Sequence, residues 1–168
     1  MEKTLRVLNR MVKDGVIEQY AIGGAVAAVF YIEPINTNDL DIFFHVKDAG
    51  GKLDILAPLY HYLSGLGYKA EREAVDIEGW PVQFLPIFNP LLEEAVEQAN
   101  EIRFKRTKTR VMRAEHLVAI MLQTGRLKDF ARIHQFMEHG VNDALLFQIL
   151  ERHGLMEQWK TRYTENPK

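Results

Sequence analysis

Two aspartates separated by a single residue, Asp39 and Asp41, are the side chains whose types and spacing could do chemistry. Residues two apart in an extended strand point to the same face, so both carboxylates project together while Leu40 points toward the core. Two carboxylates held this close repel each other unless a cation lies between them. Oxygen ligands of this kind suit Mg²⁺ or Mn²⁺, with waters and substrate phosphates in the remaining positions. The pair therefore predicts a site for a divalent metal.

A glycine pair, Gly23 and Gly24, precedes these acids, and Asp39 stands fifteen residues after Gly24. Glycines let backbone N–H groups approach a phosphate closely, and the small apolar stretch 25–31 is typical of a buried helix whose positive end would face it. Alone, the glycine pair is more often a tight turn, and Asp-x-Asp is more often two solvated acids. Together, in a strand–loop–helix–turn–strand order, they favour phosphoryl or nucleotidyl transfer.

The elements that must position these residues follow from the apolar pattern. Helices are predicted near 5–12, 25–31, 53–66 and 90–99, a turn over 34–38, and strands near 20–22, 40–44, 68–77 and 81–86. A basic segment, 103–113, precedes the last third of the chain, which is helical only, over 115–124, 127–139 and 143–153. We therefore expect an α+β fold, a mixed sheet with flanking helices in a core over 1–112, and a helical segment over 113–168 packed on that core.

Composition excludes several other classes of protein. Hydrophobic residues make up 47% and charged residues 26% of the 168, with a formal charge of -2, so no overall field attracts nucleic acid. The absence of cysteine excludes disulfides and thiolate chemistry, and the single serine, Ser64, argues against a serine hydrolase. No apolar run approaches the roughly 20 residues that cross a bilayer, and the first fifteen residues carry charges throughout where a signal peptide would have an apolar core. We expect a cytoplasmic protein without membrane contact.

The segment 22–44, IGGAVAAVFYIEPINTNDLDIFF, resembles the signature of the DNA polymerase beta-like nucleotidyltransferase superfamily. That signature has Gly-Gly or Gly-Ser, a helix, and then Thr-x-Asp-x-Asp, which residues 37–41 match position by position. The sequence is also similar to small prokaryotic members related to the AbiEii toxin group. In these, a helical segment with a Lys-Asp-x-x-Arg-like motif follows the core, as residues 128–132 do here.

The resemblance implies a nucleotidyltransferase-type fold and transfer of a nucleotidyl group from an NTP such as ATP, with Mg²⁺ or Mn²⁺. It implies that Asp39 and Asp41 are catalytic metal ligands and that Gly23, Gly24 and Thr37 contact the substrate. By the same resemblance, Lys128 faces the triphosphate. The acceptor would be RNA, a protein or a small molecule.

The sequence departs from the family pattern at two positions. Relatives carry a third acid on a later strand, where the best positional match here is Gln83, and many place an arginine at the position of Ile35. Glutamine cannot act as a base and binds a divalent cation more weakly than a carboxylate does. Asp76 and Glu78, on the neighbouring arm of a hairpin, are the acids that could substitute.

Two alternatives follow from these departures. With Gln83, the chain could be a catalytically degenerate member that binds a nucleotide or a partner, for example within a toxin–antitoxin pair. The basic segment 103–113 could instead serve an RNA-binding adaptor, although it contains a single aromatic residue. Asp129 and Arg132 also have the i,i+3 spacing of a surface ion pair, which would give this part of the motif a structural role.

Overall fold

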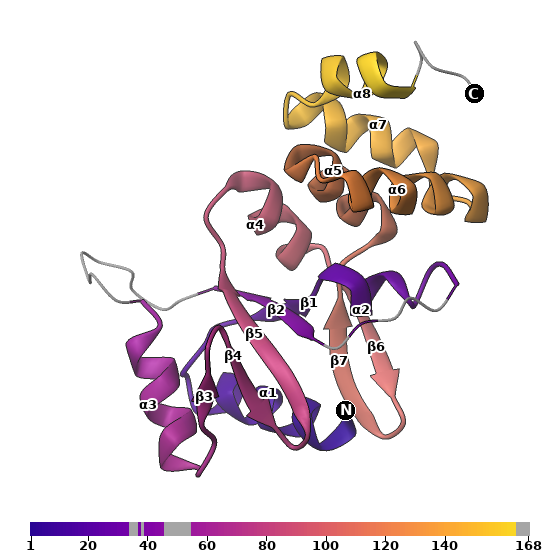
Figure 1. The fold of residues 1–168 in the computed structure, drawn as a ribbon. Helices are drawn as coiled ribbons and strands as arrows, with labels where there is room; N and C mark the ends of the chain where they lie inside the picture. Colours follow the sequence, from indigo (N-terminus) through magenta and orange to yellow (C-terminus); the bar gives the residue numbers. More distant parts are fainter. Residues whose placement is uncertain (34–36, 38, 46–54, 164–168) are drawn as a thin grey trace.

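A seven-stranded mixed sheet forms the centre of this computed structural model, which describes residues 1–33, 37, 39–45 and 55–163. Its strands are β1 (Tyr20–Ile22), β2 (Leu40–Phe44), β3 (Ala70–Glu71), β4 (Ala74–Ile77), β5 (Trp80–Pro86), β6 (Asn100–Phe104) and β7 (Thr107–Val111). They lie in the order β3-β4-β5-β2-β1-β7-β6 (Figure 1). Strand β2 is antiparallel to β1 and parallel to β5, and β1 is parallel to β7.

Strand β2 occupies the middle of this sheet and has one buried, apolar face and one partly exposed face. Leu40, Ile42 and Phe44 are almost fully buried, whereas the alternating residues Asp41 and Phe43 are partly exposed on the other face. This alternation is the two-residue period of a strand whose apolar face is covered. The carboxylate of Asp41 is therefore fixed by the burial of its neighbours.

The part of the chain that the structure describes contains eight helices. They are α1 (Glu2–Lys13), α2 (Gly24–Ala28), α3 (Ala57–Gly65), α4 (Pro90–Glu97), α5 (Ala114–Thr124), α6 (Leu127–His139), α7 (Asp143–Arg152) and α8 (Met156–Tyr163). Of these, α5 to α8 stack on one another beside the sheet (Figure 1). Helix α1 packs on β7, α4 on β1 and β2, and α2 on β2. The start of α4 is set as the Asn-Pro pair predicts, because Asn89 accepts a hydrogen bond from the N–H of Leu92 at 2.9 Å with Pro90 in the first turn.

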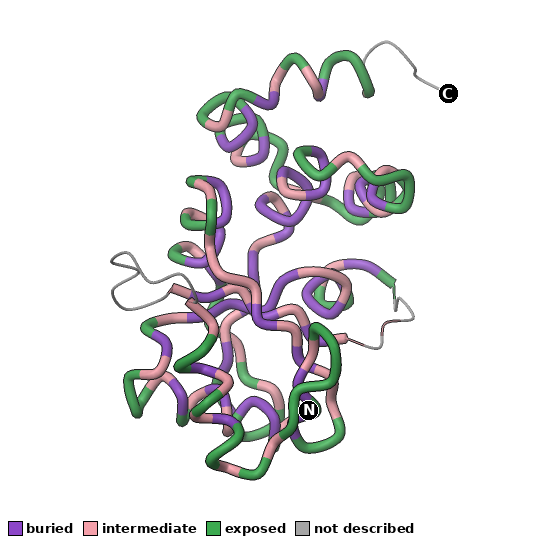
Figure 2. Tube along the Cα trace, turned by 60° about the vertical axis from the view of Figure 1, so that its left-hand side comes forward, coloured by how far each residue is buried: buried purple, intermediate pink, exposed green. Residues whose placement is uncertain are grey.

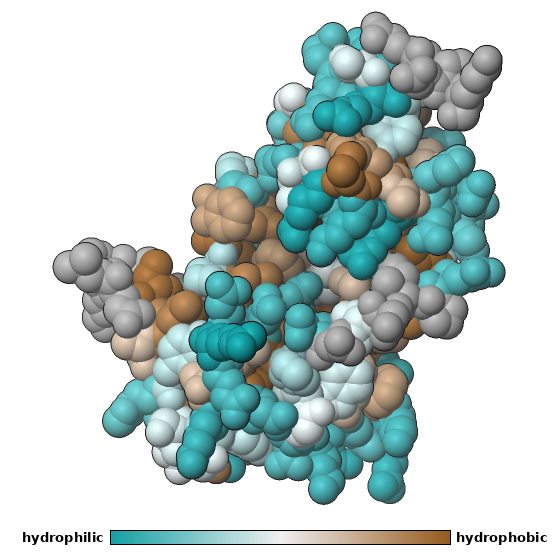
Figure 3. Space-filling model, viewed as in Figure 1, coloured by the Kyte–Doolittle hydropathy of each residue, from teal (hydrophilic) through white to brown (hydrophobic). Residues whose placement is uncertain are grey.

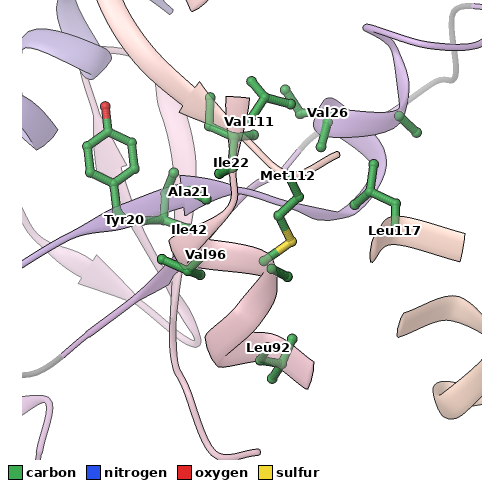
Figure 4. Packing of buried hydrophobic residues seen from close by; sticks show 14 of the residues in the cluster. Tyr20, Ala21, Ile22, Val26, Ile42, Leu92, Val96, Val111, Met112 and Leu117 are labelled. Atoms are coloured by element: carbon green, nitrogen blue, oxygen red, sulfur yellow. The ribbon is translucent and has the colours of Figure 1, made fainter. Parts of the chain in front are cut away.

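The core joins the sheet to the helices that follow it. Ile22 and Ile42 of the central strands, Val96 of α4 and Leu117 of α5 belong to one buried cluster, with Met112 between β7 and α5 (Figure 4). Buried positions continue along the inner sides of α5, α6 and α7 (Figure 2). In the space-filling view, apolar side chains gather where these helices meet the sheet, and the outer surfaces are mostly hydrophilic (Figure 3).

A half-buried carboxylate, Glu94 of α4, joins α4 to α5 and to the end of α7. It accepts hydrogen bonds from His116 of α5 at 3.2 Å, from His153 just after α7 at 2.8 Å, and from Arg152 at 2.5 Å. Burial favours the protonated form of Glu94, but the bonds from His153, Arg152 and His116 outweigh it and lower its pKa to about 2. Burial lowers the pKa of His116, although Glu94 opposes that shift.

Most predicted elements occur where the pattern places them. Strands β1 and β2 have the predicted bounds, and the glycines at 125 and 140 end α5 and α6. The strand predicted over 68–77 is instead two, β3 and β4, because Arg72 adopts a left-handed φ of 59° and turns the chain. Helix α8 escaped prediction because it buries one large side chain, Trp159, and so shows little apolar periodicity.

The helix predicted over 25–31 is shorter, because α2 ends at Ala28 and the apolar side chains of Val29 and Phe30 are exposed. Part of the turn predicted over 34–38, including Ile35, and the start of the helix predicted over 53–66 lie outside the described residues. Within the described ranges, every helix is too short or too polar to cross a bilayer.

Candidate active site

The Gly23-Gly24 turn lies directly against the start of β2. The backbone N–H of Gly23 donates to the carbonyl oxygen of Asp41 at 3.0 Å. Gly24 has a left-handed φ of 57°, and a Cβ at this position would lie 2.8 Å from Cγ of Asp41 and closer still to Oδ2. A Cβ on Gly23 would lie 2.5 Å from the ring of Phe43. Both glycines are therefore required, one of them by the carboxylate of the acid pair itself.

A cleft of about 490 Å³ opens on this face of the sheet and is closed on its other side by α5 and α6. Its size falls in the range of small-molecule sites. The polar lining residues are Gly24, Thr37, Asp39, Asp41, Gln83, Thr124, Arg126, Lys128, Asp129 and Arg132. The apolar ones are Ala25, Phe43, Leu85, Met112, Leu117, Ile120 and Met121. Every residue that the sequence places at the site, apart from the buried Gly23, lines this one cleft.

The surroundings of Asp41 disfavour its negative charge. Burial raises the pKa of Asp41, and the neighbouring charge of Asp39 raises it further. The cations Arg126, Lys128 and Arg132 act in the opposite direction and lower it. A region that disfavours two negative charges, with cations opposite, is suited to a metal ion and an anionic ligand together.

Three cations face the acid pair from α6 and from the residue just before it. The site predicted from the sequence includes Lys128, but Arg126 and Arg132 line the cleft as well. Lys128 and Arg132 are four residues apart and so share one side of the helix, which is the signal that could have identified Arg132. Arg126 carries no such signal, because it precedes the helix as its N-cap residue.

The ion pair predicted between Asp129 and Arg132 does not form. Both side chains line the cleft, but Asp129 lies on the buried side of α6 with Ile133 and Phe136, and Arg132 is less buried. The carboxylate pairs with Arg126 instead, at 3.4 Å between Nε and Oδ2. Asp129 thus has its i,i+3 partner three residues before it in the sequence, and not three residues after it.

Neither a protein-family model nor a curated protein matches this chain by sequence. Among solved structures it is similar to an antigenic nucleotidyltransferase-like protein from Paracoccidioides brasiliensis, with a TM-score of 0.57 over 94% of this chain and 92% of that one, at 14% identity. It is also similar to ANT(2")-Ia in complex with adenylyl-2"-tobramycin, with a TM-score of 0.50 over 89% of this chain and 98% of that one, at 13% identity. The chain has a nucleotidyltransferase-type fold. The finer likeness to the AbiEii group stays a prediction.

Within this nucleotidyltransferase fold, Gln83 occupies the position beside the acid pair. The parallel register of β2 and β5 places Gln83 opposite Asp41, and Phe84 opposite Ile42. Directly paired residues point to the same face, so the amide of Gln83 stands next to the Asp41 carboxylate in the cleft. Among the described residues, no three carboxylate, imidazole or thiol side chains are grouped to hold a metal.

The two acids that could have replaced a third carboxylate are engaged elsewhere. Asp76 accepts a hydrogen bond from the N–H of Gly79 at 3.0 Å. Glu78 accepts one from the hydroxyl of Tyr68 at 2.8 Å. Neither side chain lines the cleft. The hairpin therefore supplies no carboxylate to the site in this conformation.

Of the remaining residues predicted from the sequence, Thr37 lies in the cleft and the charged residues of segment 103–113 do not. Thr37 lines the cleft, and its hydroxyl donates to the carbonyl oxygen of Asp39 at 3.3 Å. The basic segment 103–113 forms most of the β6–β7 hairpin, and none of its charged residues lines the cleft. Arg110 and Arg113 hydrogen-bond to backbone carbonyls at the end of α4 and just after it, so they brace the fold.

Proposed function

We propose that this chain transfers a nucleotidyl group from an NTP to an acceptor, with a divalent metal held by Asp39 and Asp41. The observation that carries the proposal is the packing of Gly24 against Asp41, because it holds a glycine of the cleft lining directly beside the carboxylate pair. The cations of α6 on the opposite wall supply the charge that a triphosphate needs.

The donor set fits Mg²⁺ or Mn²⁺. Asp39 and Asp41 are both on the cleft, their ligand atoms are oxygens, and mutual repulsion contributes to the raised pKa of Asp41. When bound, the metal would neutralise phosphate charge and polarise the phosphorus under attack. Two protein carboxylates leave the other positions of such an ion to phosphate oxygens and water.

The chain's own residues would hold the nucleotide in place. The backbone of Gly24 would approach the phosphates, while Lys128 and Arg132 would contact them from α6. The N–H of Gly23 already donates to the carbonyl oxygen of Asp41, so Gly23 would hold the turn in place. Helix α2 has only five residues, so the glycine turn contributes more than the dipole of that helix. The attacking oxygen and the leaving pyrophosphate would lie in line through the α-phosphorus, and this positioning would supply much of the rate.

The identity of the acceptor is open between RNA, a protein and a small molecule. The solved ANT(2")-Ia complex holds adenylyl-2"-tobramycin, which supports small molecules as the first class to test. No charged residue of segment 103–113 lines the cleft, so this basic hairpin gives little support to an RNA acceptor that would bind there.

A second candidate function is nucleotide binding without turnover, as in a degenerate member of a toxin–antitoxin pair. It is favoured by one observation, the pairing of Gln83 with Asp41 where relatives carry an acid. The experiment that separates the two is label transfer from each of the four α-labelled NTPs, with Mg²⁺ or Mn²⁺, to aminoglycosides, total tRNA and a proteome lysate. Transfer that needs the acid pair supports the enzyme. Nucleotide binding without transfer to any acceptor supports the second candidate, and absence of both contradicts the proposal.

A further inference from the structure

A third carboxylate lines the cleft, and it comes from α6 rather than from the sheet. Asp129 is 4% exposed and lies across the cleft from Asp39 and Asp41. It does not join them as a metal ligand, since no three such groups are clustered among the described residues. Its Oδ2 is buried and accepts no hydrogen bond, although Nε of Arg126 approaches to 3.4 Å. A buried carboxylate in this state requires a reason, because desolvating a charge is costly.

The buried side of α6 fixes where Asp129 can point. Ile133 and Phe136, one and two turns further on, are almost fully buried and anchor that side of the helix. The Arg126 side chain, in contrast, is 62% exposed and long, so holding it in one place costs rotamer entropy. A rigid, buried partner reduces the number of positions that such an arginine samples.

The contact engages one edge of the guanidinium and leaves the other free. Nε of Arg126 faces Asp129, and the two Nη groups have no hydrogen-bond or ion-pair partner among the residues that the structure describes. Arg126 lines the same cleft as Asp39 and Asp41. A planar guanidinium with a free terminal edge is the donor arrangement that binds phosphate oxygens in pairs.

We infer that Asp129 is a positioning residue that holds Arg126 over the cleft, where its free edge receives the phosphates of the bound nucleotide. This inference rests on the proposed function, because it takes the ligand to be a nucleoside triphosphate. It assigns Arg126 to the binding of the nucleotide and Asp129 to the orientation of Arg126, and it gives Asp129 no part in proton transfer.

The sign of one substitution separates positioning from simple electrostatics. Asp129 places a negative charge in a site for an anion, so its removal by Asp129→Asn should tighten nucleotide binding if charge alone matters. If Asp129 acts through Arg126, the same substitution releases the arginine and weakens binding. In an Arg126→Ala background the positioning effect disappears, and Asp129→Asn should then be neutral or tighten binding.

The test is isothermal titration calorimetry with Mg²⁺ and α,β-methylene-ATP, which cannot undergo transfer at the α-phosphorus, and in parallel with inorganic tripolyphosphate. We expect Arg126→Ala to weaken binding about tenfold or more, since a charge-assisted hydrogen bond is lost. Asp129→Asn should weaken it about three- to tenfold, a share of the same contribution. The fold-changes should match for the two ligands, because the contact is to phosphate.

Asp143→Asn is the matched control, because Asp143 is likewise an acid in the first turn of a long helix but is exposed and away from the cleft. It should leave both affinities unchanged, and melting temperatures confirm that each variant is folded. Unchanged or tighter binding by Asp129→Asn would overturn the inference. It would also be overturned if Asp129→Asn weakened binding as much in the Arg126→Ala background as in the wild type. A loss of transfer without loss of binding would also overturn it and assign Asp129 to proton transfer. If the wild type binds neither ligand, the proposed function fails first and the inference falls with it.

Discussion

Gly24 and Asp41 are packed so closely that position 24 has no room for a side chain: a Cβ there would lie 2.8 Å from Cγ of the aspartate. The left-handed φ of 57° at Gly24 adds a second requirement for glycine. The turn and the acid pair are thus one unit, in which the carboxylate occupies the space that the glycine leaves. Any change at position 24 is transmitted to the proposed metal ligand.

Gly24→Ala should therefore both destabilise the protein and abolish nucleotide binding. The control is Gly15→Ala, since Gly15 also has a left-handed φ, of 72°, but nothing lies within 4 Å of its missing Cβ. The control should lower the free energy of unfolding by about 1–2 kcal/mol through backbone strain alone. Gly24→Ala should cost more, because the Asp41 carboxylate must move. Urea denaturation and calorimetry with Mg²⁺ and ATP measure the two effects, and a Gly24→Ala protein that binds ATP normally would contradict the account.

Glu94 predicts a pH dependence of stability. Its pKa of about 2 in the folded protein lies below the ordinary value of 4.5, so the unfolded chain binds the proton more readily. The stabilisation from Glu94 is therefore complete above about pH 4.5 and is lost as the pH falls toward 2. Glu94→Gln should lower the free energy of unfolding by roughly 2 kcal/mol at pH 7, because charge-assisted hydrogen bonds are lost.

The comparison is made by urea denaturation at pH 7 and pH 3, with Glu93→Gln as the control. Glu93 is the exposed neighbour of Glu94 on the same helix, so its change should be close to neutral at both pH values. The difference between wild type and Glu94→Gln should shrink at pH 3. A difference that is the same at both pH values would show that packing, and not the charge, is responsible.

Gln83→Asp should add a carboxylate from the sheet next to the acid pair, because Gln83 is paired with Asp41 in the register of β2 and β5. The added negative charge should destabilise the metal-free protein and increase the stabilisation by Mg²⁺ or Mn²⁺. If the new carboxylate serves as a base, label transfer from an α-labelled NTP should rise by up to ~10²–10⁴-fold. Gln135→Asp, an exposed position on α6 outside the cleft, controls for the added charge. A wild type that already transfers label at about 1 s⁻¹ would show that Gln83 does not limit the reaction.

The local pattern predicts the sheet side of the site and much less of the helical side. Leu40 through Phe44 alternate as a half-buried strand, so the direction of Asp41 follows from the residues beside it. The contact of Asp129 with Arg126 depends on which side of α6 faces α5. Arg126 and Arg132 are each three residues from Asp129, so helical spacing alone does not show which of them is its partner. The Glu94 cluster joins residues 22, 58 and 59 positions apart, and no local pattern indicates such contacts.

The central claim is that Asp39 and Asp41 hold a metal–nucleotide complex, and the melting temperature tests it most directly. Saturating Mg²⁺–ATP, at about 100 times its Kd, should stabilise the wild type by about 2.7 kcal/mol, which for a chain of this size raises the melting temperature by roughly 5–10 °C. Asp39→Asn with Asp41→Asn should abolish that rise while leaving the ligand-free protein as stable or more stable, because the repulsion that raises the pKa of Asp41 is removed. A double variant that gains the same metal-dependent rise as the wild type would contradict the account and place the site elsewhere.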